Sequence, residues 1–303
     1  MNKNFKWVMA AIIVCGASLF TSCDDKDKEL SATEQLTQKM LGKWMPVESN
    51  GVEVLTDQKT VTTFKLTASG LKAYTSVSSF VMPSQTQSNS QDASKPDEWK
   101  HEQEADVKIE NGKFIVTRPI NDTINQISRY YILEAKGSTI EIYISTRLSI
   151  NGQEVMGAMG HTEVWSKVNV GYSKDIVGLW EGHVTSDTSR FDDGETHRWR
   201  YNADGTYVYY SQDQEGNWKE VESVFNNYFV DGYLLCTRWK NVGEDEYENR
   251  EWWEIESIDN DSMKWTAQRV EYEYVSGPNL GVVVAIPNKY TATFSMTRVD
   301  ERK

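Results

Sequence analysis

Cysteine is scarce in this chain, which limits how its fold can be held together. Only three cysteines occur, Cys15, Cys23 and Cys236. Cys15 and Cys23 lie within the first 23 residues, so Cys236 is the only cysteine in the rest of the chain. A lone cysteine cannot form an intramolecular disulfide, and we interpret Cys236 as a small buried apolar side chain.

Histidine and recognisable catalytic motifs are also sparse. The sequence contains no nucleophile elbow, P-loop or dinucleotide fingerprint, and its histidines lack metal-binding spacing. Carboxylates are plentiful, but an acid on an alternating strand, such as Glu254 or Glu256, usually faces water. We therefore predict no catalytic residue, no metal, no cofactor and no enzymatic activity. The dispersed histidines are His101, His161, His183 and His197.

Basic residues are in the minority. The formal net charge is −13, and the first 22 residues carry two lysines and no acid, so removing them gives −15. An acidic chain without a basic patch does not favour phosphate backbones, so we exclude nucleic acid as a partner.

The N-terminus has the pattern of a secretion signal. Lys3 and Lys6 precede an apolar run over 7–20, which is shorter than the roughly 20 residues that span a bilayer. We therefore predict a signal peptide at residues 1–22. Small residues then lead to Cys23, which resembles the lipidated cysteine of bacterial lipoproteins, although Phe20 stands where leucine is usual.

Residues 23–30 follow as a predicted lipidated cysteine and acidic tether, because a charged segment with few apolar residues cannot order itself. An acidic run in this place resembles the export signal of Bacteroidetes lipoproteins; a plain spacer is the other interpretation. The resemblance implies a protein anchored to the outer membrane through lipid on Cys23 and exposed at the cell surface.

The remaining chain contains an internal repeat with a lag of about 130 residues. Landmarks recur in one order, which predicts domains at 31–168 and 175–303 joined by a linker at 169–174. The matched segments are 41–44 with 177–180, 64–70 with 199–205, 98–100 with 217–219, 111–118 with 231–238, 129–134 with 250–256, and 165–168 with 296–299.

Each copy reads as a series of short strands. Polar and apolar residues alternate, as over 139–144, which indicates strands with one buried face. Asn111-Gly112, Asp204-Gly205 and Asp231-Gly232 are typical of hairpin turns. Helix is expected only after a capping box at Ser31. We predict an all-β fold of two tandem antiparallel up-and-down β-barrels with about eight strands each.

Gly42-x-Trp44 and Gly178-x-Trp180 open the two copies after a short helical lead. This pattern resembles the lipocalin and wider calycin families, and the chain is similar to the tandem lipocalin-like domains of Bacteroidetes lipoproteins over residues 36–300. The middle motifs and disulfide of secreted lipocalins are absent, so the resemblance does not carry over their retinoid or steroid ligands.

The resemblance also implies how each barrel is plugged at its closed end. In calycin barrels the Trp of the opening motif lies there beneath a basic side chain from the last strand. We therefore expect Trp44 to pair with Lys167 and Trp180 with Arg298. The arginine pair should be the tighter, because a guanidinium is planar and weakly hydrated.

Seven of the eleven tryptophans lie in the second copy. They either fill the barrel or line a cavity or surface platform. Trp252 and Trp253 are adjacent, so they should face opposite sides of their strand. We expect the second barrel to be the binding unit, with candidate ligand-binding residues Trp199, Tyr201, Tyr209, Arg238 and Trp252.

Three functional hypotheses follow. The first is a non-enzymatic binding lipoprotein whose barrels hold a small apolar or amphipathic ligand. The second is a surface module with solid barrels that binds glycan or protein through exposed, coplanar aromatics. The third is an enzyme with an unrecognised carboxylate pair. A void above about 300 Å3 favours the first hypothesis. The polar segment 82–97, with two prolines, is expected to be a mobile loop.

Overall fold

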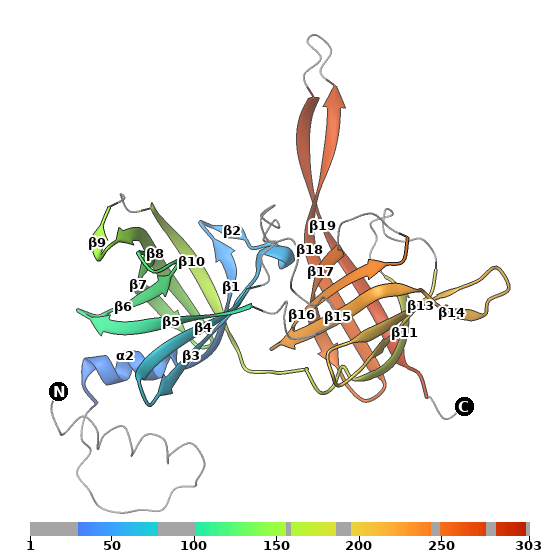
Figure 1. The fold of residues 1–303 in the computed structure, drawn as a ribbon, viewed down its shortest axis with the longest axis horizontal. Coiled ribbons are helices and arrows are strands. Elements are labelled where there is room, and N and C mark those ends of the chain that lie inside the picture. The colour runs from blue at the N-terminus through green and yellow to red at the C-terminus, as the bar shows by residue number, and fades with distance from the viewer. Residues whose placement is uncertain are drawn as a thin grey trace, which may run out of the picture.

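The computed structural model describes residues 30–77, 101–155, 159–185, 195–243, 249–276 and 283–300. The predicted signal peptide, Cys23 and the segment 82–97 lie outside these ranges. Within them the chain is almost entirely antiparallel β-structure in two barrel-like domains (Figure 1). The predicted all-β fold of two tandem barrels is therefore confirmed. No helix in the described ranges is long and apolar enough to cross a membrane.

The first domain is a closed barrel of eight main strands. Each main strand pairs with the next, and the ring closes because β10 pairs with both β8 and β1. Closure removes the free edges that would otherwise invite pairing with other chains. Its elements are α2 (Ala32–Met40), β1 (Gly42–Ser49), β2 (Val52–Glu53), η1 (Thr56–Gln58), β3 (Val61–Thr67), β4 (Gly70–Val77), β5 (His101–Glu110), β6 (Lys113–Pro119), β7 (Ile124–Lys136), β8 (Thr139–Ile150), β9 (Gln153–Glu154) and β10 (Met159–Val168).

The second domain is a curled nine-stranded sheet in which the first and last strands, β11 and β19, also pair. Its elements are β11 (Gly178–Val184), β12 (His197–Tyr201), β13 (Tyr207–Gln212), β14 (Trp218–Glu220), β15 (Ser223–Asp231), β16 (Leu234–Asn241), β17 (Asn249–Ile258), β18 (Ser262–Ser276) and β19 (Val283–Arg298).

This second barrel differs from the prediction in its closure. The equivalents of β4 and β5, which pair over six residues in the first barrel, are β13 and β15, and only the isolated bridge Thr206–Asn227 joins them. Strand β14 pairs with the C-terminal half of β13, from Tyr210 to Gln212, and so occupies the edge to which β15 would have to bond to close the barrel. The domain is therefore a half-barrel with a gap on one side rather than a closed ring of eight strands.

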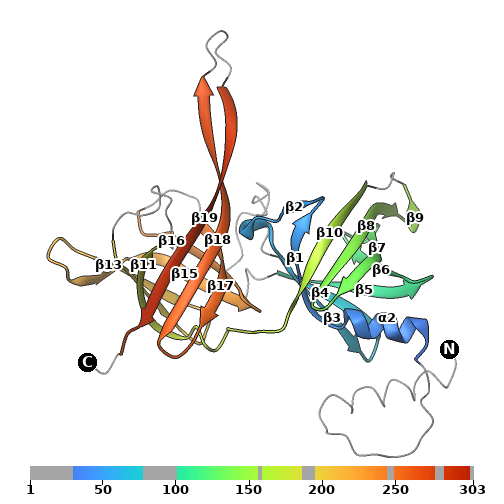
Figure 2. The ribbon, with the colours of Figure 1, turned by 180° about the vertical axis from the view of Figure 1, so that it is seen from behind.

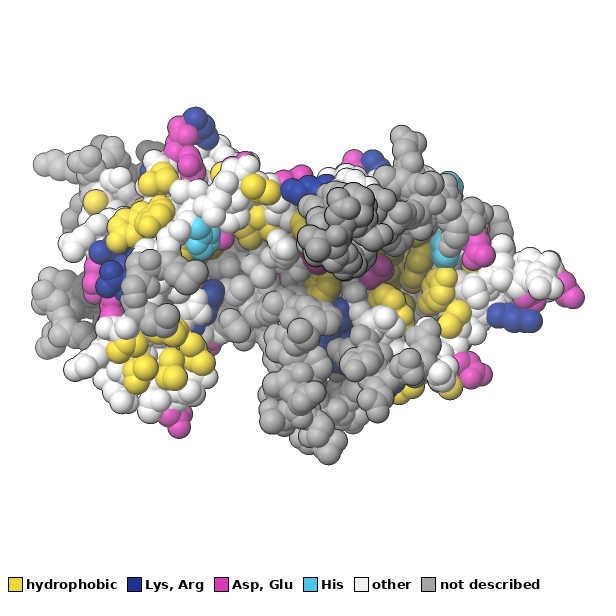
Figure 3. Space-filling model, turned by 90° about the horizontal axis from the view of Figure 1, so that it is seen from above, with side chains coloured by type: hydrophobic (Ala, Val, Ile, Leu, Met, Phe, Trp, Pro, Cys, Tyr) yellow, Lys and Arg dark blue, Asp and Glu magenta, His cyan; other side chains and the backbone are white. Residues whose placement is uncertain are grey.

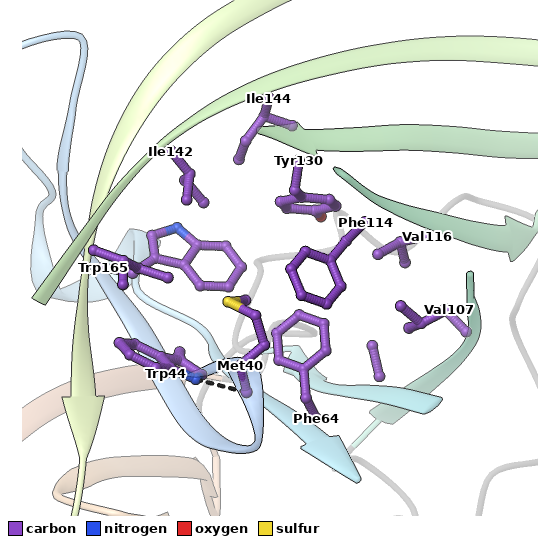
Figure 4. Close-up of a cluster of buried hydrophobic side chains, with 13 residues drawn as sticks. Met40, Trp44, Phe64, Val107, Phe114, Val116, Tyr130, Ile142, Ile144 and Trp165 are labelled. Atoms are coloured by element: carbon purple, nitrogen blue, oxygen red, sulfur yellow. Dashed lines mark hydrogen bonds between the residues drawn. The ribbon is translucent and has the colours of Figure 1, made fainter. Parts of the chain in front are cut away.

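Each barrel has its own hydrophobic core. In the first, the Phe64 ring lies 6.2 Å from Phe114 and 6.3 Å from Trp165, measured between centroids, and Met40, the last residue of α2, packs beside Phe64 (Figure 4). The helix starts at the predicted capping box, where the Ser31 side chain and the Glu34 backbone and carboxylate bond reciprocally. The helix thus brings its one buried residue under the aromatic cluster.

Both predicted cation–ring pairs are present at the closed ends. Arg298 lies 4.2 Å from the centroid of the Trp180 ring, and the Lys167 ammonium lies 5.5 Å from that of Trp44. Each pair occupies the same register position, because Trp44 is opposite Lys167 and Trp180 is opposite Arg298 in their ladders. A Cβ on Gly178, which has φ +140°, would collide with the Arg298 guanidinium, so glycine is needed there.

A third apolar cluster joins the two barrels. Val61 and Met45 of the first barrel pack with Leu234, Cys236 and Trp252 of the second, and all five are buried. The lone cysteine is thus a buried apolar residue, as its isolation in the sequence suggested. The cluster makes the boundary between the barrels a packed interface rather than a flexible joint.

Polar contacts also cross the same boundary, where they are buried or partly buried. Both carboxylate oxygens of Glu254 lie 2.8 Å from the Lys59 ammonium, and one also accepts a 2.7 Å hydrogen bond from Thr56. Asp231 is bonded by Lys43 and Ser76 of the first barrel. The expectation that Glu254 faces water is wrong, because its carboxylate bonds to Thr56 of η1 and to Lys59, both in the first barrel.

One hairpin extends far beyond the second barrel. Strands β18 and β19 pair over their whole length, from Ser262–Thr297 to Ser276–Val283, and project past the other strands (Figures 1 and 2). Their lower halves belong to the barrel wall, since β18 also pairs with β17 and β19 with β11.

Candidate functional site

The second barrel contains a cavity of about 300 Å3, and Trp180 is not among the residues that line it. Its walls come from inward-facing residues of β12, β13 and β15 to β19. Seen from above, hydrophobic side chains are visible within this barrel (Figure 3, right). The aromatic residues that line the cavity are His197, Trp199, Tyr201, Tyr207, Tyr209, Trp239, Trp253, Trp265 and Phe294.

The rings around Trp199 brace one another. Trp199 lies 5.4 Å from Trp265 and 5.6 Å from both Tyr209 and Phe294, measured between ring centroids, and it meets Phe294 edge to face. His197 stacks on Tyr209, and its Nδ1 lies 2.7 Å from the Tyr209 hydroxyl. Such contacts restrict each ring, so the cavity wall is pre-formed and presents flat apolar faces.

Two charged residues, Glu251 and Arg269, complete the cavity wall. Glu251 accepts a 3.2 Å hydrogen bond from the Trp253 indole and lies 3.5 Å from the Arg269 guanidinium. Arg269 in turn lies 4.5 Å from the centroid of the Trp253 ring. Because the acid and the base face each other, this corner carries little net charge and can serve as a polar contact for an otherwise apolar ligand.

The tyrosines at the base of the cavity are held in their neutral form. Burial raises the pKa of Tyr201 and of Tyr207, and the nearby Glu251 charge adds to both shifts. A neutral phenol can donate a hydrogen bond, whereas a phenolate cannot. The cavity therefore offers hydroxyl donors throughout the physiological pH range.

The structure brings three of the five predicted ligand-binding residues together: Trp199, Tyr201 and Tyr209 line the cavity. Arg238 does not, because it alternates with the cavity-lining Thr237 and Trp239 and faces the other side of β16. There its guanidinium lies 4.7 Å from the Phe225 ring centroid and donates to Asn227.

Trp252 is the other exception. It faces away from the cavity and is buried against the first barrel. Its neighbour Trp253 points inward and lines the cavity instead. The adjacency of the two tryptophans predicted opposite orientations but not which of them faced in. The register of β17 decides it, since Trp252 pairs with Cys236 and Trp253 with Leu235.

Sequence reasoning also missed several cavity residues. Trp239, Trp265 and Phe294 complete the aromatic wall, while Glu251 and Arg269 form its polar corner. A signal was available for Glu251, because it lies two residues from Trp253 on one strand face. Pairing between distant strands, such as that of Trp265 with Phe294, could not be read from local alternation.

A second cavity, of about 450 Å3, lies in the first barrel, and its lining is mostly polar. No three histidine, cysteine, aspartate or glutamate side chains gather as a metal site within the described ranges. No protein-family model and no curated protein matches this sequence. The cavities and their lining are therefore the basis for functional inference.

Proposed function

We propose that this chain is a non-enzymatic, lipid-anchored binding protein of the bacterial envelope, and that its second barrel binds a small apolar or amphipathic ligand. The observation that best supports this proposal is the cavity of about 300 Å3, whose aromatic wall residues pack against one another. That volume falls at the lower end of the range of small-molecule sites, about 300–1,000 Å3. A ligand of this size would contact several rings at once.

The polar corner indicates what kind of ligand would be oriented there. Glu251 and Arg269 supply an acceptor and a donor at one point of a mainly aromatic wall. A flat ring or a short branched chain with one polar group satisfies both parts of this lining. Such a ligand buries apolar area at about 25 cal/mol per Å2 while the polar group fixes its orientation.

The alternative, a surface module with solid barrels, is less well supported. It requires exposed and coplanar aromatic rings. Trp252, the outward-facing tryptophan, is buried at the interface. Tyr131 and Tyr143 are exposed neighbours on the first barrel, but their ring planes are tilted by 50°. A tilted pair does not offer the flat platform on which a sugar ring stacks.

The cavity can be tested by native mass spectrometry of protein purified from its own cells. We expect a retained ligand in the wild type and its loss in Thr237→Phe, which adds a ring to a cavity-lining position. Thr291→Phe adds the same ring at an exposed position of β19 and should retain the ligand. Equal retention in both variants would contradict binding in this cavity.

The anchor is tested separately by Cys23→Ala. Loss of the acylated thiol should release the protein from the envelope into the soluble fraction, because the lipid chains supply the membrane affinity. Cell fractionation followed by immunoblotting measures this directly. A mutant that still sediments with membranes would show that lipid on Cys23 is not the anchor.

A further inference from the structure

The interior of the first barrel changes character along its strands. On β6 the inward positions are Phe114 and Val116 in the core and then Arg118 in the cavity. On β10 the inward series is Trp165, Glu163 and His161. The half near the Trp44 plug is therefore apolar and solid, whereas the opposite half carries charged and hydroxyl side chains around a cavity of about 450 Å3.

Polar side chains inside a barrel are costly unless they are solvated or bonded. Two hydroxyl pairs line this cavity, Thr62 with Thr75 at 3.1 Å and Ser128 with Thr146 at 3.0 Å. Each hydroxyl oxygen has two acceptor lone pairs and one donor, so these pairs retain bonding capacity toward the cavity. The lining is thus suited to a hydroxylated molecule rather than to an apolar one.

Arg118 is the cation of this cavity. Its Nη2 donates a 2.7 Å hydrogen bond to Thr75, while its buried Nε has no hydrogen-bond partner. Among the described residues, no carboxylate lies within ion-pair distance of its guanidinium. A guanidinium has five N–H donors arranged as a fork that matches a carboxylate. Arg118 therefore has guanidinium donors that no described residue uses.

The acid of the cavity is already engaged. One Glu163 oxygen lies 2.8 Å from the His161 Nε2, and the other accepts from the Trp165 indole. Burial raises the pKa of the adjacent Tyr130, on which the charges of Arg118 and Glu163 act in opposite directions. Among the described lining residues Arg118 has no carboxylate partner and the Glu163 carboxylate is already bonded, so the cavity favours a monoanion over a phosphate dianion.

We propose that the first barrel binds the carboxylate of a small hydroxyl-rich acid, such as a sugar acid, with Arg118 as its anchor. The carboxylate meets the unused guanidinium donors, and the ligand hydroxyls bond to the threonine and serine pairs. This site is separate from the aromatic cavity in the second barrel. An experiment that disproves binding at one of them therefore leaves the proposal for the other intact.

Isothermal titration calorimetry on the full chain without its signal peptide tests the proposal, with glucuronate, galacturonate and gluconate as probes. We expect at least one of the three to bind and Arg118→Met to weaken it by about tenfold or more, as loss of a charge-assisted hydrogen bond implies. Arg118→Lys, which keeps the charge and loses the fork, should fall between them. Circular dichroism establishes that each variant is folded.

The controls separate the contributions. Arg147→Met removes an exposed arginine that pairs with Glu154 on the outer wall and should leave binding unchanged. Glucose tests the hydroxyls without the carboxylate, acetate the carboxylate alone, and inorganic phosphate a competing anion; each should bind more weakly. The proposal is overturned if no sugar acid binds, if folded Arg118→Met or Arg118→Lys binds as well as wild type, or if phosphate binds best.

Discussion

The two barrels are alike at their closed ends and different at their open ends. Each closed end has a buried tryptophan whose indole donates to the backbone carbonyl four residues earlier, Trp44 to Met40 and Trp180 to Ile176. Above this plug the first barrel presents hydroxyls and an arginine, whereas the second presents aromatic rings. The plug is thus a shared requirement of the fold, and the cavity lining differs between the two copies.

The largest expected effect comes from removing a plug. Trp180→Ala should lower the free energy of unfolding by about 3–5 kcal/mol, because a large buried side chain is replaced by a void. Trp180 is fully buried and Trp44 is 2% exposed, so Trp44→Ala should fall in the same range. Urea denaturation of both variants measures this, and a loss below 1 kcal/mol at either position would refute its role as a plug.

The interface between the barrels gives the next largest effect. Trp252→Ala should cost about 3 kcal/mol, the lower end of the range for such truncations, because water can enter the space it leaves. It should also uncouple the barrels, so that peptides from 101–155 and 249–276 reach their hydrogen-exchange transitions at different urea concentrations.

Trp218→Ala is the matched control for the interface. Trp218 lies at the far side of the second barrel, on β14, where Arg198 covers its ring at 4.1 Å from the centroid. Its loss should leave the two barrels unfolding together. If Trp252→Ala also unfolds in a single transition with unchanged midpoint, the apolar cluster does not couple the domains.

The buried tyrosines of the second barrel should lower the free energy of unfolding at alkaline pH. Burial raises the pKa of Tyr228 to about 12, and that of Tyr201 and Tyr207 as well. The folded state keeps these phenols neutral while the unfolded chain ionises from about pH 10, so stability is lost as pH rises beyond that value. At pH 10.5 the three together should cost about 2–3 kcal/mol relative to pH 9.

Tyrosine variants test how much Tyr207 of the second barrel contributes to this loss. Tyr207→Phe cannot ionise, so its stability should fall less between pH 9 and 10.5 than that of the wild type. Tyr143→Phe, at an exposed position of the first barrel, should reproduce the wild-type decline. Urea midpoints at the two pH values provide the measurement, and equal declines in both variants would argue against Tyr207 as a contributor.

The features that the two barrels share were the more predictable ones. The resemblance of the two Gly-x-Trp motifs to calycin barrels implied the pairs Trp44–Lys167 and Trp180–Arg298, and the members of each pair lie opposite each other in their ladders. What the barrels do not share was less predictable. Which face of β17 carried Trp253, and whether Glu254 met water, depended on strand register and on the other barrel.

The smallest expected effect distinguishes the two plugs by their cations. Arg298 donates 2.9 and 2.8 Å hydrogen bonds to the carbonyls of Val177 and Asp175 while covering Trp180. Lys167 lies farther from Trp44, at 5.5 Å, and its compact, strongly hydrated ammonium gains less over a ring. Arg298→Met should therefore cost about 1–2 kcal/mol and Lys167→Met about 0.5 kcal/mol.

Conservative exchanges show whether the fork or the charge produces that difference. Arg298→Lys retains the charge but loses the paired hydrogen bonds, so it should recover less than half of the stability lost in Arg298→Met. Lys167→Arg should be neutral or stabilising, since a guanidinium stacks on an indole better than an ammonium does. Urea midpoints decide both cases; full recovery in Arg298→Lys would mean that charge alone accounts for the tighter plug of the second barrel.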